Sequence, residues 1–212
     1  LEQGKTVPRG KRVSLLYFID PLFREAARLS VDGDARSHNQ SAILALGVYL
    51  GSHHFETLLG PIRPAEQRLI PVPYHVELAG RRDLRLHFVF SAVFKILADQ
   101  GVSFAIGEFK ELLDAERGGS GFSFVDLAAD RAGTLFAVAA TRDQRTARQV
   151  QEILHGVQRE EELFPPIQGL PEGLSKAGFD RTYGALDSPQ YRAVEAKIDQ
   201  RLKQLPLYRT AL

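Results

Sequence analysis

Ionisable side chains in the middle of the chain are the ones best suited to do chemistry. Asp83 and His87 are four residues apart, and so are Asp126 and Asp130. Two side chains at this spacing share one face of a helix. The flanking residues are mostly apolar, and a carboxylate is rarely buried unless it is paired or binds a cation, so each group needs a partner. The full candidate functional cluster is Asp83, His87, Lys110, Glu111, Asp114, Ser123, Asp126 and Asp130.

Two kinds of chemistry fit this cluster, and the sequence leaves both open. In the first, His87 is a metal ligand or a general base, and a divalent metal is the cofactor. The metal ligands would then be His87, Glu111, Asp114 and Asp130. In the second, His87 is a core histidine hydrogen-bonded to Asp126 or Asp130. Lys110 and Glu111 then form an internal ion pair that fixes the helix register.

Two further features have weaker chemical interpretations. His53 and Glu56 share a helix face, as in carboxylate–histidine metal sites, although histidines near a helix end are more often surface groups. The Gly-Gly-Ser-Gly segment at 118–121 could cradle an anion or could simply turn the chain. For both features the structural interpretation is preferred.

Capping and breaking residues predict a mostly helical chain with one short strand, Tyr74–Leu78. Asp20 and Ser37 are expected to be N-caps, and Gly133 inside a helix predicts a close approach to a neighbouring helix. The predicted helices are Pro21–Leu29, Ser37–Leu59, Asp83–Gln100, Ser103–Arg117, Ser123–Ala140, Gln144–Arg159, Ser175–Tyr183 and Pro189–Leu205.

The fold class that follows is all-α. We predict a multi-helix bundle whose central antiparallel helices come from Asp83–Ala140 and Ser37–Leu59, with an irregular, Pro-rich C-terminal extension. Residues 1–212 are expected to form a single helical domain, with a core at 83–140 and an extension at 160–212 that packs on it. The extension must bury its aromatic residues, which are Phe179, Tyr183, Tyr191 and Tyr208.

Composition and motifs exclude several classes of protein. The chain has no cysteine, so disulfides, thiolate nucleophiles and Cys-ligated metals are ruled out. A formal net charge of +1 argues against a nucleic-acid partner. No P-loop, GxGxxG, HExxH or GxSxG motif is present. The most apolar stretches are interrupted by charges, which favours buried helices or peripheral membrane association over a membrane span.

Three segments in the middle of the chain resemble one known family. DLRLHF at 83–88 followed by Ser91-Ala92, GEFKELLD at 107–114 and GSGFSFVDLAADRAG at 119–133 follow a D-x-x-x-H-F…S-A, K-E-x-x-D, G-S-G-F-S order. This order resembles the YfiM-like family of bacterial envelope lipoproteins and, more distantly, the VanZ-like membrane family, over about Asp83–Phe136. The chain departs from the pattern at Leu84, where the family usually has Lys, and it has no lipobox cysteine.

The resemblance implies a location in the bacterial periplasm or envelope, with an envelope component or a protein as partner. It implies no particular reaction. The preferred function is therefore an envelope helical protein, a structural or binding module with a buried His/carboxylate network. The alternative is a divalent-metal-dependent or acid/base hydrolase acting on an envelope component. Whether the chain is an enzyme stays open at this point.

Overall fold

Two long helices, α4 (Arg82–Asp99) and α6 (Phe124–Thr141), form the middle of the fold. The computed structural model describes residues 10–51, 74–99 and 121–209. The backbones of the two helices approach closely at Gly133, where an added Cβ would lie 2.1 Å from the carbonyl oxygen of Phe88. The predicted close approach at Gly133 is therefore confirmed. It brings the buried faces of both helices into direct contact.

Helix α2 (Ala35–Leu46) packs against α6. Arg36 Nε donates to the carbonyl oxygen of Thr141, and Asn39 Nδ2 donates to that of Ala140, each at 2.9 Å. The start of α2 thus lies beside the end of α6.

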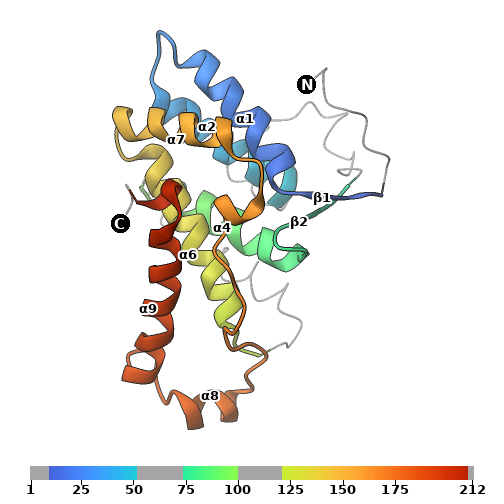
Figure 1. The fold of residues 1–212 in the computed structure, drawn as a ribbon, viewed down its shortest axis with the longest axis vertical. Helices are drawn as coiled ribbons and strands as arrows, with labels where there is room; N and C mark the ends of the chain where they lie inside the picture. Colours follow the sequence, from blue (N-terminus) through green and yellow to red (C-terminus); the bar gives the residue numbers. More distant parts are fainter. Residues whose placement is uncertain (1–9, 52–73, 100–120, 210–212) are drawn as a thin grey trace.

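The two central helices α4 and α6 were predicted to be antiparallel, but their contacts run in the same direction, from Arg81 with Asp126 to Ser91 with Asp130. The fold is mostly helical, as predicted (Figure 1). Its hydrophobic core includes the buried apolar residues of α4 and α6.

Helix α1 (Leu16–Leu29) begins five residues earlier than predicted. The prediction placed Asp20 at the N-cap and Pro21 at the first position, but Pro21 lies inside the helix. Leu15, Ile19 and Phe23 recur on one face and are almost completely buried. Burial of this stripe outweighs the one hydrogen bond that the proline removes near the helix start, so tertiary packing extends the helix backwards.

The N-cap of α2 is Asp34, not Ser37 as predicted. Its carboxylate accepts the backbone N–H groups of Arg36 and Ser37. Hydrogen bonds from the side chains of Ser37 and Gln144 lower the pKa of Asp34 to about 2. After Leu46 the helix continues as a π-helical turn, Gly47–Gly51. The rest of the helix predicted to reach Leu59 lies outside the described residues.

Helix α7 (Gln144–Gly156) lies across α1 and α2 and is joined to them by buried neutral groups. Asn39 Nδ2 donates to the carbonyl oxygens of Ala140 and Ala147. Gln151 Nε2 donates to Asn39 Oδ1 at 2.8 Å and to Ser30 Oγ at 3.0 Å. Asn39, Gln151 and Ser30 form what we call the amide network, which satisfies polar groups that would otherwise be buried without partners.

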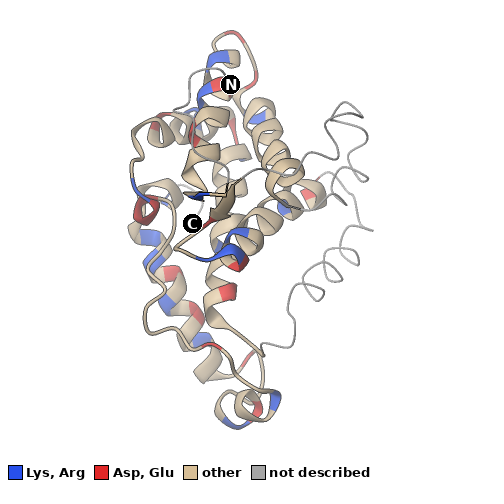
Figure 2. Ribbon diagram, turned by 90° about the vertical axis from the view of Figure 1, so that its right-hand side faces the viewer, with Lys and Arg blue, Asp and Glu red and all other residues tan. Residues whose placement is uncertain are grey.

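Charged residues of both signs are interspersed along the ribbon (Figure 2). Within the part of the chain that the structure describes, no helix is both long enough and apolar enough to cross a membrane. The apolar residues of α4 and α6 are instead used to form the protein core.

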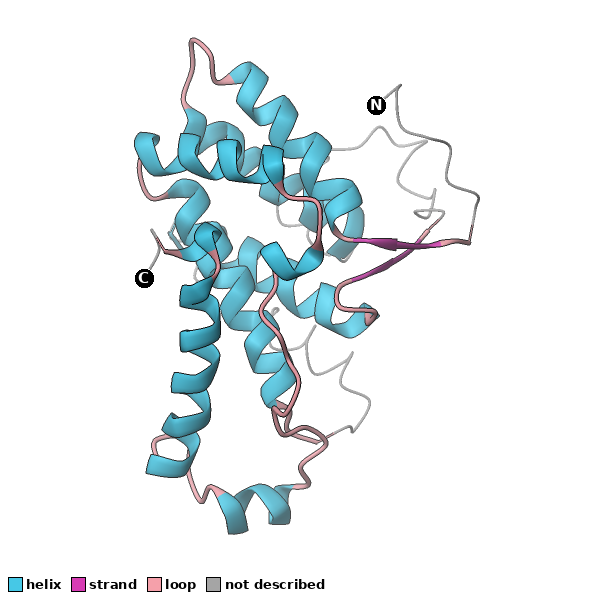
Figure 3. Cartoon of the chain, viewed as in Figure 1, coloured by secondary structure: helices cyan, strands magenta, loops and turns pink. Residues whose placement is uncertain are grey.

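Two short strands pair in parallel beside the helices (Figure 3). Strand β1 (Arg12–Ser14) aligns Val13 with Val76 of β2 (His75–Glu77). The prediction of a strand at Tyr74–Leu78 is therefore confirmed in substance. Strand β1 was not predicted, because three residues are too few to show an alternating pattern.

The C-terminal part folds over α6 through helices α8 (Lys176–Thr182) and α9 (Pro189–Gln204). Ser175 is the N-cap of α8, and Ser188 is the N-cap of α9. Tyr183 and Tyr191 pack against Phe124, with ring centroids 5.0 and 5.2 Å away. The short helices η3 (Glu160–Glu162) and η4 (Pro206–Tyr208) complete this part.

The predicted burial of the C-terminal aromatic residues is confirmed. Tyr183, Tyr191 and Tyr208 are buried, and Phe179 is partly buried against the same core. Tyr208 donates its hydroxyl proton to the carbonyl oxygen of Leu163 at 2.5 Å. Burial raises the pKa of Tyr208, so this hydroxyl stays protonated and remains a donor.

Candidate functional site

The contact between α4 and α6 places His87 between two carboxylates one helical turn apart. His87 Nδ1 lies 3.0 Å from Asp130 Oδ1, and His87 Nε2 lies 3.7 Å from Asp126 Oδ2. Only 5% of His87 is exposed. An ionised carboxylate can only accept, so the Nδ1 proton of His87 is donated to Asp130.

Ser91 is a further member of this arrangement, one helical turn after His87 on α4. Its hydroxyl donates to Asp130 Oδ1 at 2.8 Å, so a single carboxylate oxygen accepts from both Ser91 and His87. We call His87, Ser91, Asp126 and Asp130 the His–Asp network. It links the two central helices with polar contacts in a setting that is otherwise apolar.

Asp126 is the member of the network with the least complete hydrogen bonding. The backbone N–H of Asp126 donates to Ser123 Oγ at 3.0 Å, so the predicted N-cap role of Ser123 is confirmed. Its Oδ1 atom is buried and has no hydrogen-bond partner in the described residues. Arg81 Nη2 lies 3.8 Å from that oxygen. Burial raises the pKa of Asp126, and the charge of His87 opposes this only in part.

His87 and Asp126 interact through charge and not through a hydrogen bond, because Nε2 and Oδ2 are 3.7 Å apart. The hydrogen bond of the imidazole goes to Asp130. The network thus contains one carboxyl, that of Asp126, whose pKa is raised by burial.

Arg81 connects the network to the C-terminal part of the chain. Its guanidinium bonds Asp83 Oδ2 at 2.5 Å and Glu172 Oε2 at 2.6 Å. Burial would raise the pKa of Asp83, but hydrogen bonds and charge from Arg81 outweigh it and hold the pKa below its ordinary value. Asp83 therefore remains ionised and pairs with Arg81. In the described residues no hydrogen bond or ion pair joins Asp83 to His87.

The structure brings together five of the eight predicted cluster residues around the contact of α4 with α6: Asp83, His87, Ser123, Asp126 and Asp130. The other three, Lys110, Glu111 and Asp114, lie outside the described residues, as do His53 and Glu56. In the described ranges no group of three or more His, Asp or Glu side chains is placed to hold a metal ion. The predicted metal ligands Glu111 and Asp114 belong to the part that is not described.

Sequence reasoning quoted Ser91 only within the family pattern and did not assign Ser91, Arg81 or Glu172 to the site. Ser91 follows His87 by four residues, so the same-face rule applied to the other pairs would have found it. Arg81 precedes Asp83 by two residues and gave no periodic signal. Glu172 is 91 residues from Arg81 along the chain, so only the fold could join them.

The arrangement does not match a serine hydrolase site. In a catalytic triad the serine hydroxyl donates to the histidine, which removes its proton during attack. Here Ser91 donates to Asp130. His87, Ser91 and Asp126 are each less than a tenth exposed, which leaves little access for a substrate. The geometry is instead that of a helix contact stabilised by paired, buried polar groups.

The fold and this site define a class: a mostly helical protein with a buried histidine–carboxylate network between its two central helices. Comparisons with family models, with curated proteins and with solved structures gave no match.

Proposed function

We propose that this chain is a structural or binding module of the bacterial cell envelope, in which the His–Asp network fixes α4 against α6. The observation that carries the proposal is the position of His87, buried between Asp126 and Asp130 and bonded to the latter. Buried polar pairs of this kind specify which surfaces meet more than they add to stability. A module that presents a fixed surface to a partner needs such specificity.

The arrangement of the motif residues supports a packing role. Asp83 and His87 on α4 lie near Asp126 and Asp130 on α6, and Gly133 contacts the backbone of α4. In the described residues the motif therefore encodes a contact between helices and not the lining of an open cleft. The envelope location is part of the proposal and rests on the resemblance of this motif to the YfiM-like pattern.

The test is elemental analysis by plasma mass spectrometry combined with thermal unfolding, for the wild-type protein purified without a metal-affinity tag and for His87→Ala. We expect no stoichiometric metal in either. We expect His87→Ala to lower the Tm by about 10 °C, because removing one partner of a buried charged group leaves the others uncompensated. His75→Ala is the matched control, since His75 is exposed on β2 and should leave the Tm unchanged.

A stoichiometric transition metal that is lost in His87→Ala but kept in His75→Ala would overturn the proposal. That result would favour the metal-dependent hydrolase and justify a screen of envelope substrates. An unchanged Tm in His87→Ala would also contradict the proposed packing role.

A further inference from the structure

A trough along α1 gathers basic side chains at the surface. Its first part is a groove of about 740 Å³ between α1 and α7, lined by residues that include Arg24, Arg28, Arg148 and His155. Its second part, of about 430 Å³, runs from Arg24 to β1 and is lined by Lys11 and Arg12. Arg24 lines both parts, and we call the two neighbouring hollows together the α1 trough.

The charge of the α1 trough differs from that of the whole chain. The chain has a formal net charge of only +1. The trough is lined by five Lys or Arg residues and one His, against two acidic residues, Asp20 and Glu152. Three of the cations are already ion-paired: Arg24 with Asp20, Arg28 with Glu25 and Arg12 with Glu77. The positive charge that a ligand would meet therefore comes from Lys11 and Arg148 and from the unused N–H donors of the paired guanidinium groups, and a concave surface focuses this field.

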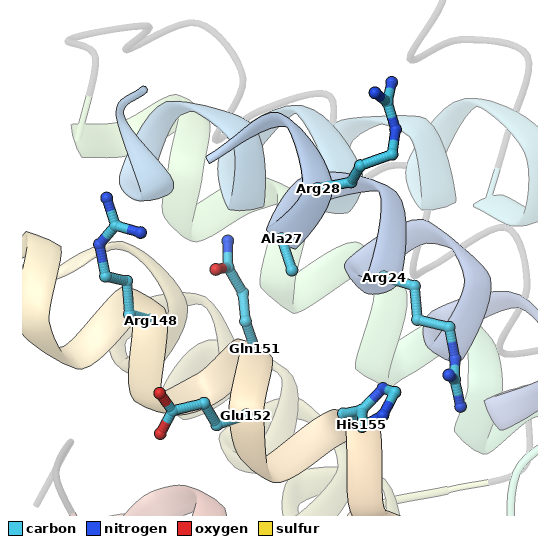
Figure 4. A pocket seen from close by; sticks show the side chains of 7 residues that line it. All are labelled: Arg24, Ala27, Arg28, Arg148, Gln151, Glu152 and His155. Carbon is cyan, nitrogen blue, oxygen red and sulfur yellow. The ribbon is translucent and has the colours of Figure 1, made fainter. Parts of the chain in front are cut away.

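Arg24 and Arg148 are the guanidinium groups most available to a ligand. Arg24 bonds Asp20 through Nε on an exposed helix face, and Arg148 makes one long bond of 3.3 Å to the carbonyl oxygen of Gly33. Each guanidinium has five N–H donors, so most donors of both remain unused by these bonds. Figure 4 shows Arg148 on one side of Gln151, and Arg24 beside His155 on the other.

Arg28 is less available in this structure. It makes two hydrogen bonds to Glu25 and extends away from α7 (Figure 4). The floor of the groove includes Ala27 and Gln151, and both amide protons of Gln151 are already donated within the amide network. Recognition must therefore come from the rim, from Arg24 and Arg148, and from the basic residues near β1.

We propose that the α1 trough binds an extended acidic segment of a partner protein. Guanidinium forks match carboxylates in shape and charge, which favours Asp and Glu side chains as the groups recognised. A linear segment can follow a concave trough, whereas a planar bilayer cannot enter it. Asp20 and Glu152 would repel a densely charged polyanion, but they can be avoided by carboxylates that alternate with neutral residues along an extended chain.

The proposal supplies a partner chemistry for the binding module and depends on the proposed function only in assuming that the chain binds and does not catalyse. The probe is a fluorescein-labelled peptide of alternating Glu and Ala, with a Gln–Ala peptide of equal length as its neutral counterpart. Fluorescence anisotropy with the full chain measures binding of both. We expect saturable binding of the acidic peptide alone, weakened by added salt because exposed charges are screened.

The discriminating variant is Arg24→Gln/Arg148→Gln, and its matched control is Arg181→Gln/Arg192→Gln, which removes two exposed arginines from α8 and α9. We expect the first to weaken peptide binding by about tenfold and the second to leave it unchanged. Circular dichroism and the Tm confirm that both variants are folded. If the first variant fails to fold, the single variant Arg148→Gln is compared with Arg192→Gln for peptide binding.

Three results would overturn the proposal: no saturable binding of the acidic peptide to the wild-type chain, equal loss of binding in both double variants, or binding that does not weaken with salt. Sedimentation with vesicles containing anionic phospholipid, together with no binding of the peptide, would assign the trough to a membrane surface instead. None of these results affects the metal and Tm test of His87, so failure here is distinct from failure of the packing role.

Discussion

Two buried polar regions hold this protein together, and they are built from different chemistry. The amide network of Ser30, Asn39 and Gln151 joins α1, α2, α6 and α7 with neutral groups. The His–Asp network joins α4 and α6 with groups that can ionise. Both amide protons of Gln151 and both of Asn39 are donated, whereas Asp126 keeps a buried oxygen without a hydrogen bond in the described residues.

This difference shows which region can respond to its surroundings. Neutral amides keep the same hydrogen bonds at every pH, so the amide network should stabilise the protein uniformly. The His–Asp network contains a carboxyl whose pKa is raised by burial, so its contribution must change as protons bind or leave. A buried ionisable pair is a costly way to join two helices when amides would serve, which is why we assign specificity to it.

The largest expected effect comes from forcing the His–Asp network apart. Gly133→Ala places a Cβ 2.1 Å from the backbone carbonyl of Phe88, which cannot move aside as a flexible side chain would. We expect a loss of about 4 kcal/mol in the free energy of unfolding, measured by urea denaturation. Gly156→Ala is the control, because nothing lies within 4 Å of its added Cβ, and it should be close to neutral.

A smaller effect is expected when one hydrogen-bonding side chain is removed from each network. Asp130→Ala leaves Ser91 and His87 without their common acceptor and should cost about 3 kcal/mol. Asn39→Ala removes the bonds to Ala140 and Ala147 and should cost about 2 kcal/mol.

Chemical denaturation at pH 5 and pH 8 separates the two regions further. The cost of Asn39→Ala should be the same at both values. The cost of Asp130→Ala should change, since it removes the acceptor of His87, which faces Asp126, a carboxyl whose pKa is raised by burial. If the Asn39→Ala cost varies with pH as much as that of Asp130→Ala, the contrast between the two networks is wrong.

The smallest effect is a difference in the direction of pH dependence between two aspartates. The folded-state pKa of Asp126 is raised, so its stabilising contribution is present below the unfolded-state pKa and is lost as pH rises through the folded value. The pKa of Asp34 is lowered to about 2, so its contribution is present above the model-compound value of 3.8 and is lost as pH falls toward 2. The two therefore act in opposite senses.

Thermal unfolding from pH 3 to pH 7 tests these opposite signs. The Tm of Asp126→Asn minus that of the wild type should increase as pH rises, because the variant no longer carries a buried negative charge. Asp34→Ala should lose Tm as pH rises, because the wild type gains an ionised cap that the variant lacks. Parallel profiles for the two variants would show that burial of Asp126 does not control its ionisation.

Much of the helical framework could be predicted from local residues. Ser123, Ser175 and Ser188 each begin the helix that was expected, because a capping hydroxyl satisfies backbone N–H groups within three residues. The start of α1 was predicted wrongly because Pro21 was taken to mark the first turn of the helix. The helix begins earlier because burial of Leu15, Ile19 and Phe23 against the rest of the fold stabilises the additional turn.

The candidate site was predictable in part. A hydrogen bond from His87 to Asp126 or Asp130 was one of two interpretations, and the structure shows the bond to Asp130. The metal interpretation also needs Glu111 and Asp114, which lie outside the described residues, so it stays a prediction. The roles of Lys110, Glu111 and Asp114 remain predictions. The Arg81–Glu172 contact could not be predicted, since it joins segments 91 residues apart and neither residue belongs to a periodic pattern.

The sequence by itself determined where α6, α8 and α9 begin, and which residues of α4 and α6 share a face, because caps and helical periodicity act within a few residues. Only the tertiary structure decided that Gln144 contacts the Asp34 cap of α2, and that Arg81 ties Glu172 to the His–Asp network. It also decided that α1 and α7 leave a basic trough between them. The physical reason is that burial and charge pairing depend on which distant surfaces meet.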